Sequence, residues 1–102
     1  MNITVYGQDD CAYCDELMKY YQRRGIPTQY VNLSNPQNAD ILQRLKDQGF
    51  GSTPIVETSN NAWCGRRKDL EVKSVLDYRT EELQRLEQQQ RALTAQHQRE
   101  LH

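Results

Sequence analysis

The chain has 102 residues, a length that supports one domain with a single core but not two. Its formal net charge is −1, which gives no electrostatic argument for binding to nucleic acid or to an anionic membrane. Three cysteines are an odd number and suit a reducing compartment better than a secreted disulfide scaffold. The chain opens on strand-like sequence without a basic-then-apolar leader, and it has no run of about 18 apolar residues. We therefore expect a cytoplasmic protein.

The first third of the chain predicts a strand, a helix and a second strand. Residues 2–6 favour a strand, and an amphipathic helical pattern follows over about residues 12–24. Gly25 and Pro27 give this helix a C-terminal stop signal. Residues 28–33 alternate and predict the second strand. This order in so short a stretch favours a βαβ crossover.

The middle of the chain predicts a second helix and two more strands. The segment 34–36, Ser-Asn-Pro, provides an N-cap with proline at the first helical position, and Gly49 ends that helix. A third strand begins at Thr53-Pro54, where the proline lacks the ladder N–H and requires an edge, a bulge or a special peptide geometry. Residues 62–64 predict a fourth strand, and a last helix starts at Val72.

These elements divide the chain into two parts. The order βαβαββα with short strands predicts an α/β domain over residues 1–78. Residues 79–102 favour a helical tail by their intrinsic propensity.

The tail leaves three arrangements open. Its apolar residues at heptad spacing are Leu83, Leu86 and Leu93. Gln90 and His97 fill other positions of the same seam and weaken it. One interpretation is a weak homodimer through a coiled coil, a second is a tail that folds back on the sheet, and the third, which we favour, is a solvated helix.

The motif that carries chemistry is Cys11-Ala12-Tyr13-Cys14, between the first strand and the first helix. Unpaired backbone N–H groups and the positive end of the helix dipole favour an anion there, and a cysteine supplies one as a thiolate. A thiolate attacks disulfides, and a second thiol one turn away resolves the mixed disulfide. We therefore predict a dithiol–disulfide oxidoreductase in which Cys11 attacks from an exposed position and Cys14 resolves from the sheltered side.

Several motifs together resemble the glutaredoxins, and within them the NrdH-type redoxins. These motifs are Tyr6-Gly7, Cys11-Ala12-Tyr13-Cys14, Gly25-Ile26-Pro27, Thr53-Pro54-Ile55-Val56 and Trp63-Cys64-Gly65 through Asp69-Leu70. The resemblance covers about residues 1–78 and implies a thioredoxin fold, with a four-stranded mixed sheet flanked by helices. It also implies a cis peptide bond at Thr53-Pro54, facing the cysteines, where the Thr53 backbone pairs with an incoming peptide or glutathione. The substrate-binding residues that it implies are Tyr13, Thr53, Pro54, Gly65 and Arg67.

Departures from the glutaredoxin pattern bear on the electron donor. Many glutaredoxins carry a basic residue shortly before the first cysteine, where this chain has Gln8, Asp9 and Asp10. Lys68 stands where an acidic residue would receive the ammonium group of glutathione. The resemblance therefore implies that electrons come from a thioredoxin-reductase-type flavoenzyme rather than from glutathione. It implies ribonucleotide reductase or another protein disulfide as the substrate, and the Cys11–Cys14 disulfide in place of a bound cofactor.

Four acidic residues flank the motif: Asp9, Asp10, Asp15 and Glu16. They suit a helix N-terminus, yet each would raise the pKa of a nearby thiol. We therefore predict that the Cys11 thiol is less acidic than in relatives with a basic flank.

Other functions remain open. A glutathione-dependent glutaredoxin would use the same cysteines with a different donor. A non-enzymatic binding module is the other alternative: either a redox sensor that uses Cys11 and Cys14 as a switch, or a metal-binding adaptor that is presented by the tail. We expect no metal, because a zinc site has four ligands and the additional candidates, at no standard spacing, are Cys64, His97 and His102. An iron–sulfur cluster bound across a dimer is a further alternative. We do not favour it, because such a cluster usually takes a ligand from glutathione, and the glutathione pocket of this chain looks degraded.

Two further features have more than one interpretation. Cys64 is most simply a small buried hydrophobic residue, with a regulatory disulfide as the alternative. Arg66-Arg67-Lys68 is either a solvated turn or a docking patch for an acidic partner.

Overall fold

A four-stranded mixed sheet forms the centre of the α/β domain. The structure is a computed structural model that describes the backbone of residues 1–100 and the side chains of residues 1–97. The strands are β1 (Thr4–Gly7), β2 (Gln29–Asn32), β3 (Ile55–Glu57) and β4 (Ala62–Cys64). Their order is β2-β1-β3-β4, with β1 and β2 parallel and the other neighbours antiparallel. The predicted four-stranded mixed sheet is thus confirmed.

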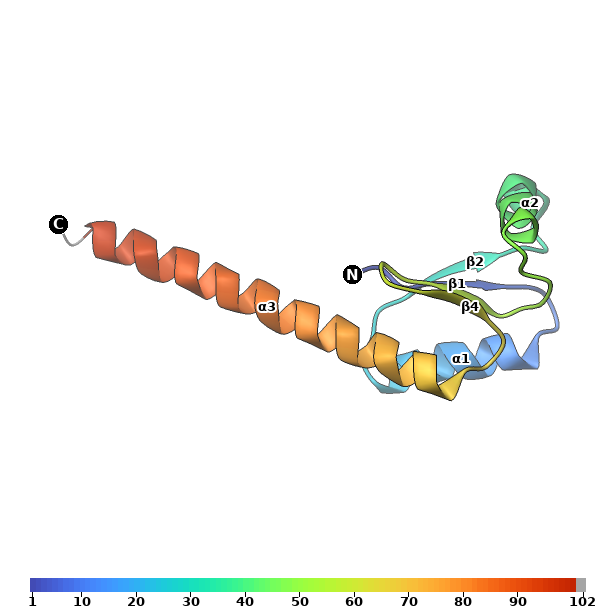
Figure 1. Cartoon of the computed structure of the whole chain (residues 1–102), viewed down its shortest axis with the longest axis horizontal. Coiled ribbons are helices and arrows are strands. Elements are labelled where there is room, and N and C mark those ends of the chain that lie inside the picture. Colours follow the sequence, from blue (N-terminus) through green and yellow to red (C-terminus); the bar gives the residue numbers. More distant parts are fainter. Residues whose placement is uncertain (101–102) are drawn as a thin grey trace.

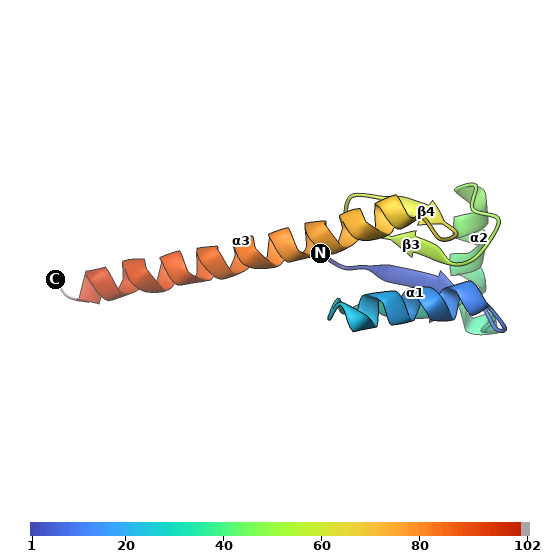
Figure 2. The ribbon, with the colours of Figure 1, turned by 90° about the horizontal axis from the view of Figure 1, so that it is seen from below.

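Helices cover both faces of this sheet (Figures 1 and 2). They are α1 (Ala12–Arg23), α2 (Ala39–Asp47) and α3 (Lys68–Glu100), with a short 3₁₀ helix, η1 (Pro36–Asn38), leading into α2. Helix α1 and the first turns of α3 lie on one face, and α2 lies on the other. The predicted element order is confirmed. No helix among the described residues is long and apolar enough to cross a membrane.

Alternation along the strands divides the core into two clusters. Val5 and Val56 point to one face, where they pack with Leu17 and Tyr21 of α1 and Val75 of α3. On the other face, the buried strand and loop residues Tyr6, Leu33 and Ile55 pack with Leu45 of α2. Burying apolar groups on both faces holds all three helices against one short sheet.

Helix α1 ends at the predicted signal. Gly25 has φ 67°, in the left-handed region where glycine is favoured. Its N–H donates to the carbonyl of Gln22 at 3.1 Å, and the N–H of Ile26 donates to the carbonyl of Tyr21 at 3.0 Å. This pair of bonds is a Schellman motif, which satisfies carbonyls that the helix leaves unpaired.

Two predicted boundaries are wrong by a few residues. The third strand begins at Ile55 rather than Thr53, because the cis peptide at Pro54 and its missing N–H keep these residues out of the ladder. The last helix begins at Lys68 rather than Val72. Its early start follows from Glu71, whose carboxylate accepts the backbone N–H of Arg67 at 2.8 Å and caps the first turn.

Helix α3 continues past the domain without a break at residue 78 (Figure 1). The molecule is therefore elongated, with extents of 61 × 26 × 20 Å. The N-terminus of α1 lies at the end of the domain away from the direction in which α3 projects (Figure 1). The division into residues 1–78 and 79–102 stays a prediction.

Candidate active site

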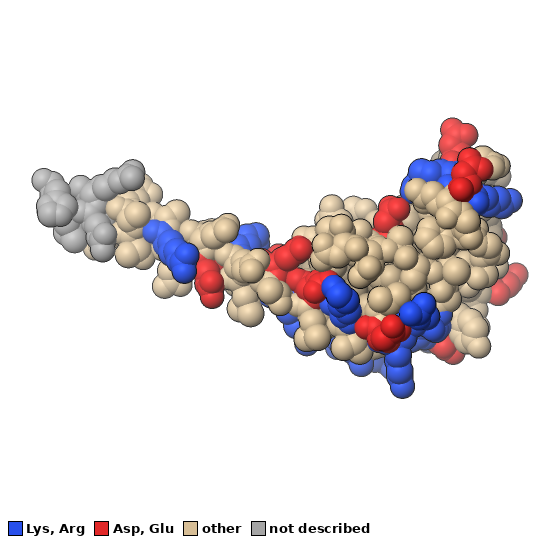
Figure 3. Space-filling model, in the orientation of Figure 1, with Lys and Arg blue, Asp and Glu red and all other residues tan. Residues whose placement is uncertain are grey.

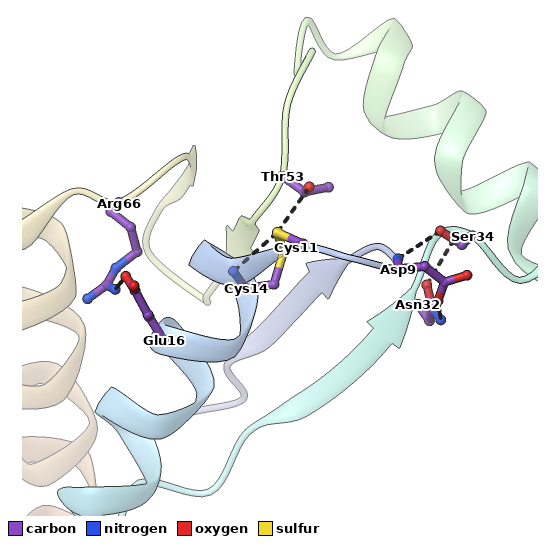
Figure 4. The surroundings of a disulfide bond; sticks show 8 residues. All are labelled: Asp9, Cys11, Cys14, Glu16, Asn32, Ser34, Thr53 and Arg66. Carbon is purple, nitrogen blue, oxygen red and sulfur yellow. Dashed lines mark hydrogen bonds and ion pairs between the residues drawn. A yellow bond between two sulfur atoms is a disulfide. The ribbon is translucent and has the colours of Figure 1, made fainter.

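Cys11 and Cys14 lie at the N-terminus of α1 and are joined by a disulfide, with their Cα atoms 5.2 Å apart. Cys11 is the N-cap of α1, and its Sγ accepts a hydrogen bond from the backbone N–H of Cys14 at 3.2 Å (Figure 4). The attacking sulfur is thus placed where the helix presents unpaired N–H groups and a positive dipole end. In the reduced protein the same N–H would stabilise a Cys11 thiolate.

The two cysteines differ in exposure. Cys14 is fully buried on the core-facing side of α1, whereas Cys11 is half-buried and lines an open hollow. A substrate sulfur can therefore approach Cys11, and Cys14 is reached only through Cys11. This asymmetry is the one that an attacking and a resolving thiol require.

Thr53 faces the disulfide from the loop before β3. Its Oγ1 lies 3.6 Å from Cys11 Sγ, and the Thr53–Pro54 peptide bond is cis, as the resemblance implies (Figure 4). The Pro54 carbonyl accepts the N–H of Gly65 at 2.7 Å, which fixes the loop against the turn after β4. Among the described residues, no hydrogen bond uses the backbone N–H or carbonyl of Thr53. These two groups are available to an extended peptide.

The hollow beside Cys11 has a volume of about 410 Å³. It lies between the active-site turn, residues 8–13, and the loop 51–53. Tyr13 forms part of its wall and is 61% exposed. Of the predicted substrate-binding residues, Tyr13 and Thr53 line the hollow; Pro54, Gly65 and Arg67 do not. Arg67 instead pairs with Asp69 at 3.2 Å.

Two of the four flanking acids have polar partners. Asp9 Oδ1 accepts a hydrogen bond from Asn32 at 2.9 Å, and its backbone N–H donates to Ser34 Oγ at 2.9 Å (Figure 4). These two bonds fix the turn before Cys11 to the end of β2. Sequence reasoning missed Asn32 and Ser34, because polar residues after a strand look like any loop. Glu16 is paired with Arg66 at 3.2 Å.

Arg66 is part of the structure rather than a free docking residue. It donates to the carboxylate of Glu71, whose side chain is 1% exposed, at 2.9 Å and also bonds Glu16 on α1. The bonds to Glu71 raise the pKa of the Arg66 guanidinium. Arg66 thereby links α1 to the start of α3, close to the active-site helix. No pattern in the sequence indicated that Glu71 would be buried.

Asp10 is the acid that stays unpaired next to the reactive sulfur. It lines the hollow with Cys11, adopts φ 55°, and has no ion-pair partner among residues 1–97. We expect Asp10→Asn to lower the pKa of Cys11 in the reduced protein, because a negative charge that opposes the thiolate is removed. Asparagine also tolerates the left-handed backbone. The rate of Cys11 alkylation against pH would then show its midpoint at lower pH.

The matched control is Asp40→Asn, which removes the same charge from an exposed position on α2, across the sheet. Its alkylation profile should superimpose on the wild type. An Asp10→Asn midpoint that stays in place or moves to higher pH would show that Asp10 does not oppose the thiolate.

Cys64 is the free cysteine and lies half-buried on β4, where it packs against the α2 side of the core. Among the described residues, no group of three or more His, Cys, Asp or Glu side chains could hold a metal ion. His102, one of the ligands considered for zinc, lies outside the described residues.

Comparison with known proteins places this geometry in a family. A scan against protein-family models finds no match. The chain is 30% identical to the glutaredoxin-like protein NrdH of Escherichia coli over 70 residues, which are 69% of this chain and 84% of that protein. It is 32% identical to NrdH of Salmonella typhimurium over 71 residues, again 69% of this chain and 84% of the relative.

Solved structures agree with this assignment. The structure of Escherichia coli NrdH-redoxin matches with a TM-score of 0.65 and 29% identity, covering 72% of this chain and 93% of that one. A glutaredoxin from Archaeoglobus fulgidus matches in fold alone, with a TM-score of 0.60 and 14% identity over 74% of this chain and 85% of that one. The predicted thioredoxin fold is therefore confirmed. The chain belongs to the glutaredoxin-like NrdH family of thiol–disulfide oxidoreductases.

Proposed function

We propose that this redoxin reduces protein disulfides with electrons from a thioredoxin-reductase-type flavoenzyme, and that ribonucleotide reductase is its substrate. The observation that supports it most directly is the half-buried Cys11 sulfur above a buried Cys14, beside a peptide-accessible Thr53 backbone. The substrate itself is the one implied by the family, and another protein disulfide would use the same chemistry.

The cycle begins with the reduced protein. The Cys11 thiolate attacks one sulfur of the substrate disulfide, forms a mixed disulfide and releases the other substrate sulfur as a thiolate. Cys14 then loses its proton and attacks the Cys11 sulfur, which re-forms the Cys11–Cys14 disulfide and releases the second substrate thiolate. Two electrons have passed to the substrate, whose thiolates take up protons. A reductase restores the dithiol with two electrons and two protons.

The charges around the hollow argue against glutathione as the donor. Glutathione carries two carboxylates, which basic side chains would recognise. The described residues that line the hollow include Asp10 and no lysine or arginine. The NrdH-redoxin of Escherichia coli is described as having a thioredoxin-like activity profile. This supports a thioredoxin-reductase-type donor for the present chain rather than glutathione.

A paired assay tests the donor. Disulfide reduction is followed by NADPH consumption with thioredoxin reductase in one arm, and with glutathione and glutathione reductase in the other. We expect turnover in the first arm only. Turnover confined to the second arm would make the protein a glutathione-dependent glutaredoxin. Turnover in neither arm would indicate a redox sensor or a binding role.

A further inference from the structure

The distal part of α3 has no support from the domain. Val75 is buried in the core, and the last polar link is the N-terminal ammonium of Met1, 3.0 Å from Glu81. This part of α3 projects from the domain (Figures 1 and 2). Among the described side chains of residues 83–97, no hydrogen bond or ion pair reaches the α/β domain. The docked turns of α3 nucleate this part of the helix, so its residues only propagate it, but they gain no packing against the domain. Another surface would therefore add stability to this part.

This helix also carries an exposed apolar stripe. The exposed fractions are Val72 48%, Leu76 57%, Leu83 62%, Leu86 50% and Leu93 62%. Residues 83–97 contain three lysine, arginine, aspartate or glutamate residues, namely Arg85, Glu87 and Arg91. Figure 3 shows that charged side chains crowd the domain and become sparse along the projecting helix. A helix meant only for solvent would have a polar surface all round.

The stripe follows a heptad pattern, and we call its eight a and d positions the seam. The a positions are Leu76, Leu83, Gln90 and His97, and the d positions are Val72, Arg79, Leu86 and Leu93. Side chains that face the domain, such as Ser74 and Val75, lie outside the seam. Of the described seam side chains, one has a hydrogen bond to the domain: Arg79 donates from one guanidinium nitrogen to the carbonyl of Arg24 at 3.3 Å. The other N–H groups of this guanidinium and the rest of the seam stay open while α3 is docked.

We propose that the seam binds the seam of a second copy of this chain, with the two helices antiparallel and the two-fold axis between Leu83 and Leu86. In this register a positions face d positions. Leu83 then faces Leu86 of the second copy, and Leu76 faces Leu93. Apolar residues thus meet apolar ones on both sides of the axis.

The polar seam residues match in the same register. Gln90 faces Arg79 of the second copy, so the guanidinium can donate to the amide oxygen. The expectation of a solvated helix assumes that Gln90 and His97 face their own copies, as in a parallel coiled coil. In the antiparallel pairing, Gln90 no longer faces a second Gln90 but Arg79, and His97 lies beside Val72 of the second copy.

A parallel dimer of the same helix places like charges together. Arg79 would face itself within the seam, at a position where charge is costly. Glu82 and Glu87 occupy g and e positions, which lie next to each other across a parallel pair. In the antiparallel register, Glu82 lies near Gln89, and Glu87 near Thr80. Charge complementarity therefore selects the antiparallel arrangement.

Sedimentation velocity over a range of concentrations tests the dimer on the full chain. We expect a dimer for the wild type and a monomer for the double variant Leu83→Glu, Leu86→Glu, because two charges are buried at the axis. The double variant Gln84→Glu, Gln88→Glu is the matched control, since it adds the same two charges at exposed positions outside the seam. Unchanged disulfide reductase activity shows that the double variant is folded, since the seam lies apart from the hollow.

A monomeric wild type at the highest concentration would overturn the proposal. A double variant that keeps its dimer mass would overturn it as well, because the contact would then lie elsewhere on the molecule. Neither result bears on the electron donor, which the paired assay measures independently.

Charge variants at position 90 test the orientation. Gln90→Glu should tighten the antiparallel dimer by about two- to tenfold in Kd, because it gains an ion pair with Arg79 on each side. Gln90→Arg should weaken it by a similar factor. In a parallel dimer each variant faces its own copy, so both would weaken association, and that outcome would contradict the proposed register.

Discussion

Replacing Cys11 with serine should lower disulfide turnover by roughly 10³-fold or more, because Cys11 supplies the one sulfur among the described residues that line the hollow. Replacing Cys14 with serine should stop the same cycle one step later. Cys11 still attacks from the α1 N-terminus, but no thiol lies beneath it to release the mixed disulfide. Turnover is measured with the active donor of the paired assay, and intact-mass spectrometry detects the trapped adduct.

Cys64→Ser serves as the control for these two variants. Cys64 packs against the core on β4 and has no part in the proposed cycle, so this variant should turn over like the wild type. Turnover that persists in Cys11→Ser would show that Cys11 is not the attacking thiol. A Cys14→Ser protein that forms no adduct would show that Cys14 is not the resolving thiol. Loss of activity in Cys64→Ser would require a third thiol in the cycle.

Glu71→Ala should reduce the free energy of unfolding by about 3–5 kcal/mol, the cost typical of breaking a buried ion pair. The Glu71 carboxylate accepts bonds from the Arg66 guanidinium and from the Arg67 N–H. Alanine would leave the Arg67 N–H without a partner and the Arg66 guanidinium with Glu16, an exposed residue, as its remaining carboxylate partner. Chemical denaturation followed by circular dichroism gives the change as a shift in midpoint.

Glu16→Ala provides a matched comparison, because Glu16 pairs with the same guanidinium from an exposed position. Its side chain is 59% exposed, against 1% for Glu71. Exposed ion pairs contribute about 1 kcal/mol or less, so Glu16→Ala should be close to wild type. Equal effects of the two substitutions would show that burial does not set the strength of this link.

The local signals in the sequence were sufficient for the element order and the reactive motif. Glycine and proline at 25 and 27 marked the end of α1, and hydrophobic alternation marked the strands. The spacing of Cys11 and Cys14 placed both sulfurs at a helix N-terminus, which needs only local geometry. The cis bond at Pro54 came from family resemblance, since a proline alone leaves several geometries open.

The parts that were missed depend on contacts between distant segments. Glu71 stands between Leu70 and Val72 in the sequence, and it is buried only because α3 packs against the sheet and α1, which periodicity cannot show. Asn32 and Ser34 reach Asp9 only because β2 pairs with β1 in register. Likewise, the docked and free faces of α3 become distinct only when the domain is in place.

The position of the reactive end also matters for how the protein can be handled. Helix α3 leaves the domain in the direction away from the N-terminus of α1, which carries Cys11 (Figure 1). On the monomeric Leu83→Glu, Leu86→Glu variant, a bead, a fluorophore or a fusion partner attached to the distal part of α3 would thus be kept at a distance from incoming disulfides. Immobilised in this way, the redoxin could serve as bait for trapping its targets, with Cys14→Ser retaining each captured protein through a covalent bond.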